Sequence, residues 1–247
     1  MTQYLDPMAV LERKFVARNE PGLPNAVHDD EFARRLGFRA GLVPGADLYG
    51  FMAELSAQAL GRRWQEAGAL SARFNSPVYD GEEVAVRASQ RPDGLALELV
   101  NPDGLVCATG AAVAVAEGGL PDREQYPVME LPSRPGPPAF VRGQALGTLR
   151  VELPCQDLAW APRLGNQILM ANADLPPWMH LESRVRHLGL PGDGEAVSVR
   201  GRVAGSWERR GHRFVDLDLL ILGSSERPLA HLRHVAIVEL APLRRRS

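Results

Sequence analysis

Apolar and polar positions alternate along most of the chain, with one clear exception. Between residues 44 and 61, apolar side chains recur three or four positions apart, at Leu48, Phe51, Met52, Leu55 and Ala59. This spacing predicts one long, mostly buried helix. Pro44 suits the first helical turn, where its missing N–H costs nothing, and Gly61 suits the left-handed conformation that closes the far end.

Short alternating runs follow this helix and indicate strands joined by tight turns. The runs cover residues 70–74, 83–89, 95–100 and 106–115. Asp-Gly and Pro-Asp-Gly sequences separate them, and these residue types favour turns because they tolerate the unusual backbone angles that a reversal needs.

The second half of the chain repeats part of this order. Residues 80–87, Asp-Gly-Glu-Glu-Val-Ala-Val-Arg, match residues 193–200, Asp-Gly-Glu-Ala-Val-Ser-Val-Arg, at six of eight positions. Two alternating runs, at 214–222 and 229–240, follow the second copy as two follow the first, which indicates a duplicated unit. In the counterpart of the long helix, residues 154–177, Pro162 and Gly165 interrupt the pattern before 166–173 regains helical spacing. We therefore expect the second helix to be degenerate.

These patterns predict an α+β double hotdog, in which two antiparallel sheets each wrap a central helix. A proline-rich stretch at 117–145 separates an N-terminal hotdog (residues 1–116) from a C-terminal one (residues 146–247). Two such halves would supply in one chain the pair that single hotdogs form from two subunits. Both a monomer and a further homodimer are compatible with this arrangement.

Composition narrows the class of protein. The chain has 247 residues, is 45% hydrophobic and carries a formal charge of −2, which argues against nucleic acid as a partner. No run reaches the twenty or so apolar residues of a membrane span, and the first twenty residues resemble neither a secretory signal nor a presequence. Cys107 and Cys155 lack CxxC spacing, which favours a reducing cytosol. We expect the basic triplet at 244–246 to be a solvated tail.

One stretch carries a family resemblance. Residues 25–33 read Asn-Ala-Val-His-Asp-Asp-Glu-Phe-Ala, with Leu-Gly-Phe at 36–38 and Val-Pro-Gly at 43–45. This stretch resembles the MaoC-like dehydratases and (R)-specific enoyl-CoA hydratases. The resemblance implies an acyl-CoA or acyl-carrier-protein thioester as substrate and no cofactor. It also implies a site between the two halves, where an Asp and a His move protons while a helix-start amide holds the thioester oxygen.

The chain departs from that family at two positions. His28 and Asn25 fall on the matching His and Asn, but Leu23 stands where the resemblance calls for the catalytic Asp. Pro44 replaces the usual His before Gly45. Leucine cannot transfer a proton, so the acid partner of His28 is unassigned, and the nearby carboxylates that could replace it belong to Glu20, Asp29, Asp30 and Asp47.

Three residues are candidates for catalysis, each with a structural alternative. His28 has an imidazole that titrates near neutral pH and could be a general base, or it could cap the short helix that follows. Gly45 could offer first-turn amides to a thioester oxygen, or merely allow close helix packing. Asp47, seven positions before Glu54 on one helix face, could polarise water as in hotdog thioesterases, or interact with the helix dipole. Asp29 and Asp30 suit a helix start better than catalysis.

Asn25, Tyr49 and Trp178 are candidates for substrate binding, with core packing as the alternative for Trp178. The histidines of the second half do not indicate a metal site; they are His180, His187, His212, His231 and His234. His231 and His234 are three apart on an expected strand and so face opposite sides.

Three functions stay open. A hydratase or dehydratase is favoured narrowly over a thioesterase that uses Asp47 or Glu54. The third is a fold that only binds an acyl group or stabilises a partner, for which Leu23 and Pro44 are the motivation.

Overall fold

The computed structural model describes residues 10–20, 22–153 and 157–241. Cys155 and the basic triplet at 244–246 lie outside the described residues. The strands of the described part are β1 (Leu11–Val16), β2 (Ala69–Phe74), β3 (Glu83–Arg91), β4 (Gly94–Val100), β5 (Val106–Val113), β6 (Leu149–Glu152), β7 (Met179–His187), β8 (Ala196–Arg209), β9 (His212–Leu222) and β10 (Pro228–Glu239). Its helices are α1 (Asp30–Arg35), α2 (Gly45–Leu60), α3 (Arg62–Ala67) and α4 (Trp160–Asn172), with 3-10 turns η1 (Ala26–His28), η2 (Arg123–Gln125) and η3 (Ser224–Glu226).

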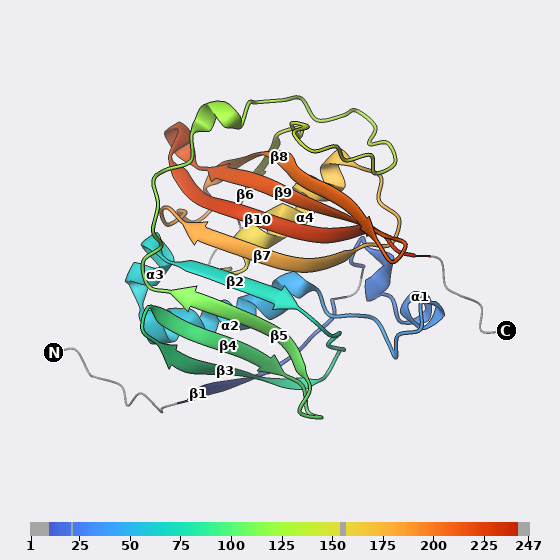
Figure 1. Ribbon diagram of the computed structural model, residues 1–247, viewed down its shortest axis with the longest axis vertical. Helices are drawn as coiled ribbons and strands as arrows, with labels where there is room; N and C mark the ends of the chain where they lie inside the picture. The colour runs from blue at the N-terminus through green and yellow to red at the C-terminus, as the bar shows by residue number, and fades with distance from the viewer. Residues whose placement is uncertain (1–9, 21, 154–156, 242–247) are drawn as a thin grey trace.

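All strands join in one antiparallel sheet with two equivalent halves (Figure 1). Its order is β1-β3-β4-β5-β2-β7-β10-β9-β8-β6. Read from each edge to the centre, the first half runs β1, β3, β4, β5, β2 and the second runs β6, β8, β9, β10, β7. The matching octapeptides therefore lead into equivalent strands, β3 and β8. The halves meet where β2 pairs with β7, from Ala69 opposite Arg186 to Arg73 opposite Glu182.

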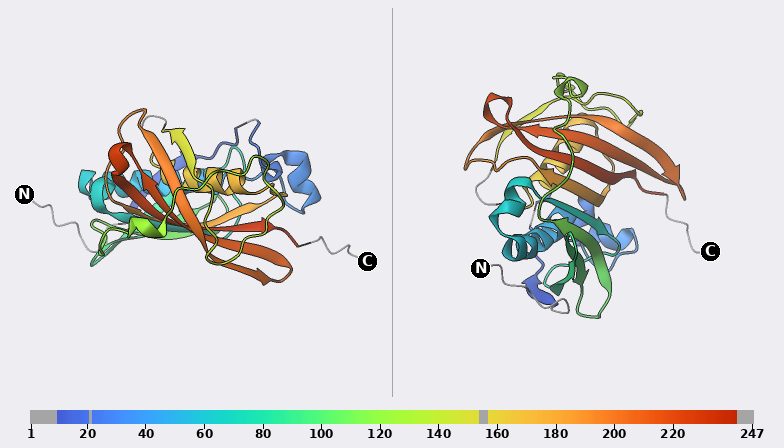
Figure 2. Two further views of the ribbon diagram at one scale, coloured as in Figure 1. Left: turned by 90° about the horizontal axis from the view of Figure 1, so that it is seen from above. Right: turned by 60° about the vertical axis from the view of Figure 1, so that its left-hand side comes forward.

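Both long helices pack on the same face of the curved sheet (Figure 2). In α2 the side chains of Leu48, Met52 and Leu55 are fully buried, as their helical spacing predicts, whereas Phe51 and Ala59 are partly buried. Gly61 ends this helix with a φ of +72° and donates its N–H to the Ala57 carbonyl. A central helix wrapped by a sheet in each half is the double hotdog architecture expected from the sequence.

The second helix corrects one expectation. Instead of being interrupted, α4 runs without a break from Trp160 to Asn172, although it is shorter than α2. Pro162 lies in its first turn, where no backbone N–H is needed. Gly165 is required by packing, because a Cβ built there would lie 2.7 Å from Nδ1 of His234 on β10.

The stretch between β5 and β6 crosses the outer face of the second half (Figure 2). Tyr126 packs there against Leu220 and Leu222 and donates its hydroxyl to Asp218 at 2.9 Å. The helices and the candidate site therefore lie on the other face of these strands. No helix in the described part of the chain combines the length and apolar character needed to cross a membrane.

Candidate active site

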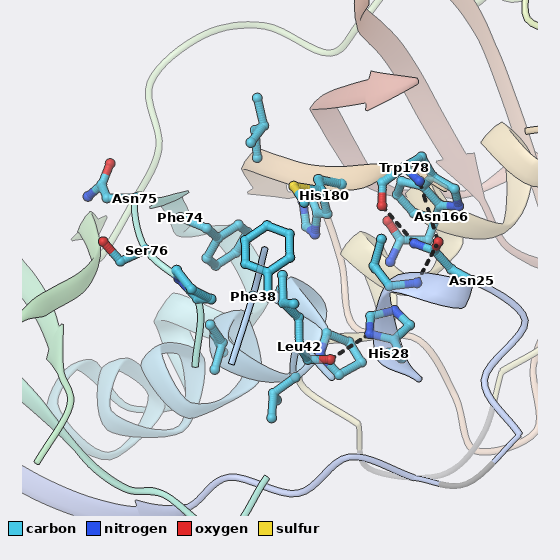
Figure 3. A pocket seen from close by; sticks show the side chains of 18 residues that line it. Asn25, His28, Phe38, Leu42, Phe74, Asn75, Ser76, Asn166, Trp178 and His180 are labelled. Atoms are coloured by element: carbon cyan, nitrogen blue, oxygen red, sulfur yellow. Dashed lines mark hydrogen bonds between the residues drawn. The ribbon is translucent and has the colours of Figure 1, made fainter. Parts of the chain in front are cut away.

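A cavity of about 210 Å³ lies where the two halves of the chain meet. Its walls come from η1, the loop that leads into α2, the first turns of α2, the end of β2, α4 and the start of β7. Most of the lining is apolar, and the polar lining residues are Asn25, His28, Asn75, Ser76, Asn166 and His180. Figure 3 shows that the labelled lining residues come from segments far apart in the sequence.

His28 is clamped between two loops. Its Nδ1 lies 2.6 Å from the Leu42 carbonyl, and its own carbonyl accepts a hydrogen bond from Asn19 at 2.6 Å. The Leu42 N–H donates in turn to Val27. A carbonyl can only accept, so Nδ1 carries the proton and Nε2 keeps its lone pair.

Burial lowers the pKa of His28 below its ordinary value of 6.5, against the opposing effects of the Leu42 carbonyl and of the Asp47 charge. The imidazole is therefore neutral at pH 7. A neutral histidine with a fixed tautomer and a free Nε2 on a cavity wall has the form that a general base requires.

Asn25 lines the cavity and also connects the two halves of the chain. Its side-chain amide donates to the Trp178 carbonyl at 2.8 Å, and its Oδ1 lies 3.4 Å from the backbone N of Val27 and of Trp178. Trp178 is buried and forms the wall between this cavity and a second hollow beside α4. Asn25 thus holds that wall in place.

Gly45 begins α2 and lines the cavity beside His180. A Cβ built on Gly45 would lie 3.0 Å from His180 Nδ1 and from the Phe74 ring. The absence of a side chain therefore lets the imidazole approach the first turn of the helix, where backbone N–H groups have no partner inside the helix.

The carboxylates near His28 in the sequence have other partners or lie outside the cavity. Asp29 caps α1 through the Phe32 N–H, and Asp30 accepts from Gly41. Asp47 pairs with Arg163 of α4 at 2.7 Å, and Glu54 pairs with Arg13 at 2.9 Å. Glu20 is exposed.

None of these carboxylates lines the cavity or hydrogen-bonds His28 within the described residues. Asp47 acts on His28 through its charge alone. Leu23, at the position where the resemblance calls for the catalytic Asp, does not line the cavity either.

Tyr49, a candidate for substrate binding, lies in the core. Its side chain is fully buried, and its hydroxyl has no hydrogen-bond partner in the described part of the structure. It does not line the cavity.

The sequence pattern indicates no role for Asn166. For His180 it argues against a metal site, and His180 lies in residues 177–183, the segment around Trp178 that the sequence favours for lining a cleft. In the described residues, Oδ1 of Asn166 and Nδ1 of His180 are buried and have no partner (Figure 3). A polar residue on the apolar side of a helix would have been the signal for Asn166. His231 and His234 do face opposite sides, His231 toward Asp218 and His234 toward Ser183.

No protein-family model and no curated protein match the sequence. Solved structures do match. A Mycobacterium tuberculosis protein with a double hotdog fold is 14% identical over 94% of this chain and 96% of its own, with a TM-score of 0.58. The dehydratase domain of PpsC from the same organism, bound to C12:1-CoA, is 12% identical over 94% and 93%, with a TM-score of 0.57.

A protein named as an oleoyl thioesterase from Lactobacillus plantarum is 12% identical over 95% of this chain and 98% of its own, with a TM-score of 0.55. The similar structures also include a MaoC-like dehydratase. At these identities the likeness defines the fold, and the double hotdog predicted from the sequence is confirmed.

Proposed function

We propose that this protein is an acyl-thioester lyase that adds water to, or removes it from, the β carbon of an acyl-CoA or acyl-carrier substrate. The observation that carries the proposal is His28, a neutral imidazole with its proton held on Nδ1 and a free Nε2 on an apolar cavity. The likeness to a dehydratase domain that binds an acyl-CoA supports the substrate class.

One imidazole is sufficient for the proton transfers. In hydration, the water oxygen bonds to the β carbon while Nε2 of His28 takes the water proton. The electron pair of the double bond moves toward the thioester, whose oxygen becomes negative beside the first turn of α2 at Gly45. The His28 proton then returns to the α carbon, so water is added overall and the catalyst is restored. Dehydration follows the same steps in reverse.

Hydrolysis of the thioester is the less favoured function. It would assign water activation to Asp47 or Glu54, and both carboxylates form ion pairs and do not line the cavity. A lyase that relies on His28 alone needs neither. We also keep the cytosol as the proposed location, on the cysteine pattern described above.

The test is mass spectrometry of the protein with saturated, 2-enoyl and 3-hydroxyacyl coenzyme A thioesters. We expect a gain or loss of 18 mass units, about one water, on an intact thioester. His28→Asn should lower the rate by about 10²–10⁴-fold, because the shorter amide can still donate to the Leu42 carbonyl but has no atom in place of Nε2. His212→Ala, which removes an imidazole at the start of β9, is the matched control and should leave the rate unchanged.

Two other outcomes reject the lyase, and a third rejects only its base. Free coenzyme A would show hydrolysis instead. Binding without conversion would favour a protein that only holds an acyl group. Unchanged turnover in His28→Asn would remove His28 as the base.

A further inference from the structure

Three side chains of the second half form a buried polar chain that ends at the cavity. His180 Nε2 lies 2.9 Å from Ser183 Oγ, and Ser183 Oγ lies 3.0 Å from His234 Nδ1. Ser183 and His234 are completely buried. The two imidazole rings also stack, with centroids 4.3 Å apart. No step proposed above uses this chain.

The outer end of the chain points at the start of α2. His180 Nδ1 is buried without a partner in the described part of the structure, and it lies 3.0 Å from the position of a Cβ on Gly45. Both residues line the cavity. Nδ1 therefore lies beside the first-turn N–H groups of the helix, and any ligand atom that contacts those groups is within reach of His180.

Ser183 Oγ has no hydrogen-bond partner other than the two imidazoles in the described residues, so its single hydroxyl proton goes to one of them and the chain has two arrangements. If Ser183 donates to His234, the proton of His180 is on Nε2 and the proton of His234 is on its enclosed Nε2. If Ser183 donates to His180, the proton of His180 is on Nδ1 at the cavity, and Nε2 of His234 keeps a lone pair.

The second arrangement has the lower cost. His234 Nε2 is buried and has no partner in the described residues. A buried N–H without an acceptor is rarer and more costly than a buried lone pair. His180 Nδ1 is also buried without a partner, but His180 lines the cavity and His234 does not. The proton is therefore best placed on His180 Nδ1, where a bound ligand can accept it.

Neither imidazole can carry this proton as a cation. Burial and the neighbouring His234 hold the pKa of His180 well below its ordinary value of 6.5, and burial lowers that of His234 to about 3. His180 is thus a neutral donor at all physiological pH values.

We propose that His180 donates a hydrogen bond from Nδ1 to the carbonyl oxygen of the bound acyl thioester, beside the backbone N–H of Gly45, and that Ser183 and His234 fix the tautomer that makes this possible. This inference rests on the proposed function for its ligand. Two neutral donors that converge on one point favour an oxygen that becomes negative during the reaction, as an enolate oxygen does.

The experiment observes the imidazole nitrogens directly. Protein with ¹⁵N-labelled histidine is studied by long-range ¹H–¹⁵N correlation, with and without butyryl-CoA, a saturated thioester that cannot be hydrated. We expect the proton of His180 on Nδ1 in the free protein and a downfield shift of this proton when butyryl-CoA binds. Ser183→Ala should give a mixture of both His180 tautomers.

Kinetics provides the second readout. His180→Phe keeps a ring against Phe74 and His234 but removes the donor, and it should lower kcat by about 10²–10³-fold with little change in KM. A proton on Nε2, or an unshifted Nδ1 signal while butyryl-CoA binds, would overturn this inference and leave the proposed function standing. Failure of butyryl-CoA to bind would overturn both.

Discussion

A polar residue between the two halves of the chain can bind the substrate or hold the halves together, and a substitution of Asn25 distinguishes these two roles. The sequence indicates substrate binding, whereas the structure engages the side-chain amide with the Trp178 carbonyl at 2.8 Å. Asn25→Ala removes the partner of a buried carbonyl that lies 153 positions away in the sequence. The two other contacts of the side chain, at 3.4 Å, are too long to contribute much.

The expected loss of stability follows from that one bond. Leaving a buried acceptor without its donor costs about 1–3 kcal/mol. For a chain of this size, each kcal/mol lowers the melting temperature by about 2–4 °C, so Asn25→Ala should melt about 2–12 °C below the wild type. Thioester affinity should fall only a few-fold, because Trp178 loses an anchor while no contact with the substrate is removed.

Two measurements test the structural role of Asn25. One is urea unfolding, and the other is the thioester dissociation constant, measured well below the melting temperature. Asn172→Ala is the control, since Asn172 hydrogen-bonds Gly147 and Ile168 and does not line the cavity. It should lose a similar stability and keep full affinity. If Asn25→Ala stays within about 0.5 kcal/mol of the wild type but loses tenfold or more in affinity, Asn25 is a substrate ligand and the structural role is refuted.

Three further predictions concern the helix start and a buried histidine. Asp47→Asn should keep kcat within about twofold in steady-state assays and lose about 1 kcal/mol or less in urea unfolding, because it only weakens a partly buried ion pair. Burial lowers the pKa of His187 from 6.5 to about 4. As the pH falls, the unfolded chain therefore binds a proton at His187 before the folded protein does. The stability of the folded protein is unaffected by this histidine above pH 6.5, and about 3 kcal/mol of it is lost by pH 4. In urea titrations at both pH values His187→Phe should lack that loss, and an equal loss in both proteins would contradict the assignment. Gly45→Ala should reduce thioester turnover at least tenfold by displacing His180, whereas Gly50→Ala, where a Cβ has room on the same helix, should leave turnover unchanged.

Elements with a strong local pattern could be predicted from the sequence. The helix expected at 44–61 is α2, and the alternating runs after it are β2 to β5, within two residues at most ends. The strands β1, β6 and β7 were not expected. Two are short edge strands, and β7 carries charged residues such as Arg184 and Arg186 at the centre of the sheet, where pairing with β2 and β10 makes it a strand. Non-local pairing leaves no local signal.

The same division applies to the site. His28 and Gly45 could be singled out because their neighbours form a recognisable stretch of sequence. Asn166 and His180 reach the cavity only because α4 and β7 pack against the first half, a contact that no spacing along the chain reveals. Asp47 illustrates the reverse case: its position suggested chemistry, but Arg163 of α4 is folded against it.

The duplicated fold has two equivalent helix starts, those of α2 and α4. The proposed catalytic residues lie around the start of α2, and the differences between the two halves explain this placement. Residues 17–44 separate β1 from α2 and include η1, α1 and the clamp around His28, whereas only residues 153–159 separate β6 from α4. The second half has no room for an equivalent of the His28 loop. It contributes His180, Asn166 and Trp178 to the cavity of the first half instead. In our proposal the base comes from one half and the buried donor from the other. The proposed site therefore depends on the pairing of β2 with β7, and changes that weaken this pairing should abolish turnover before they unfold either half.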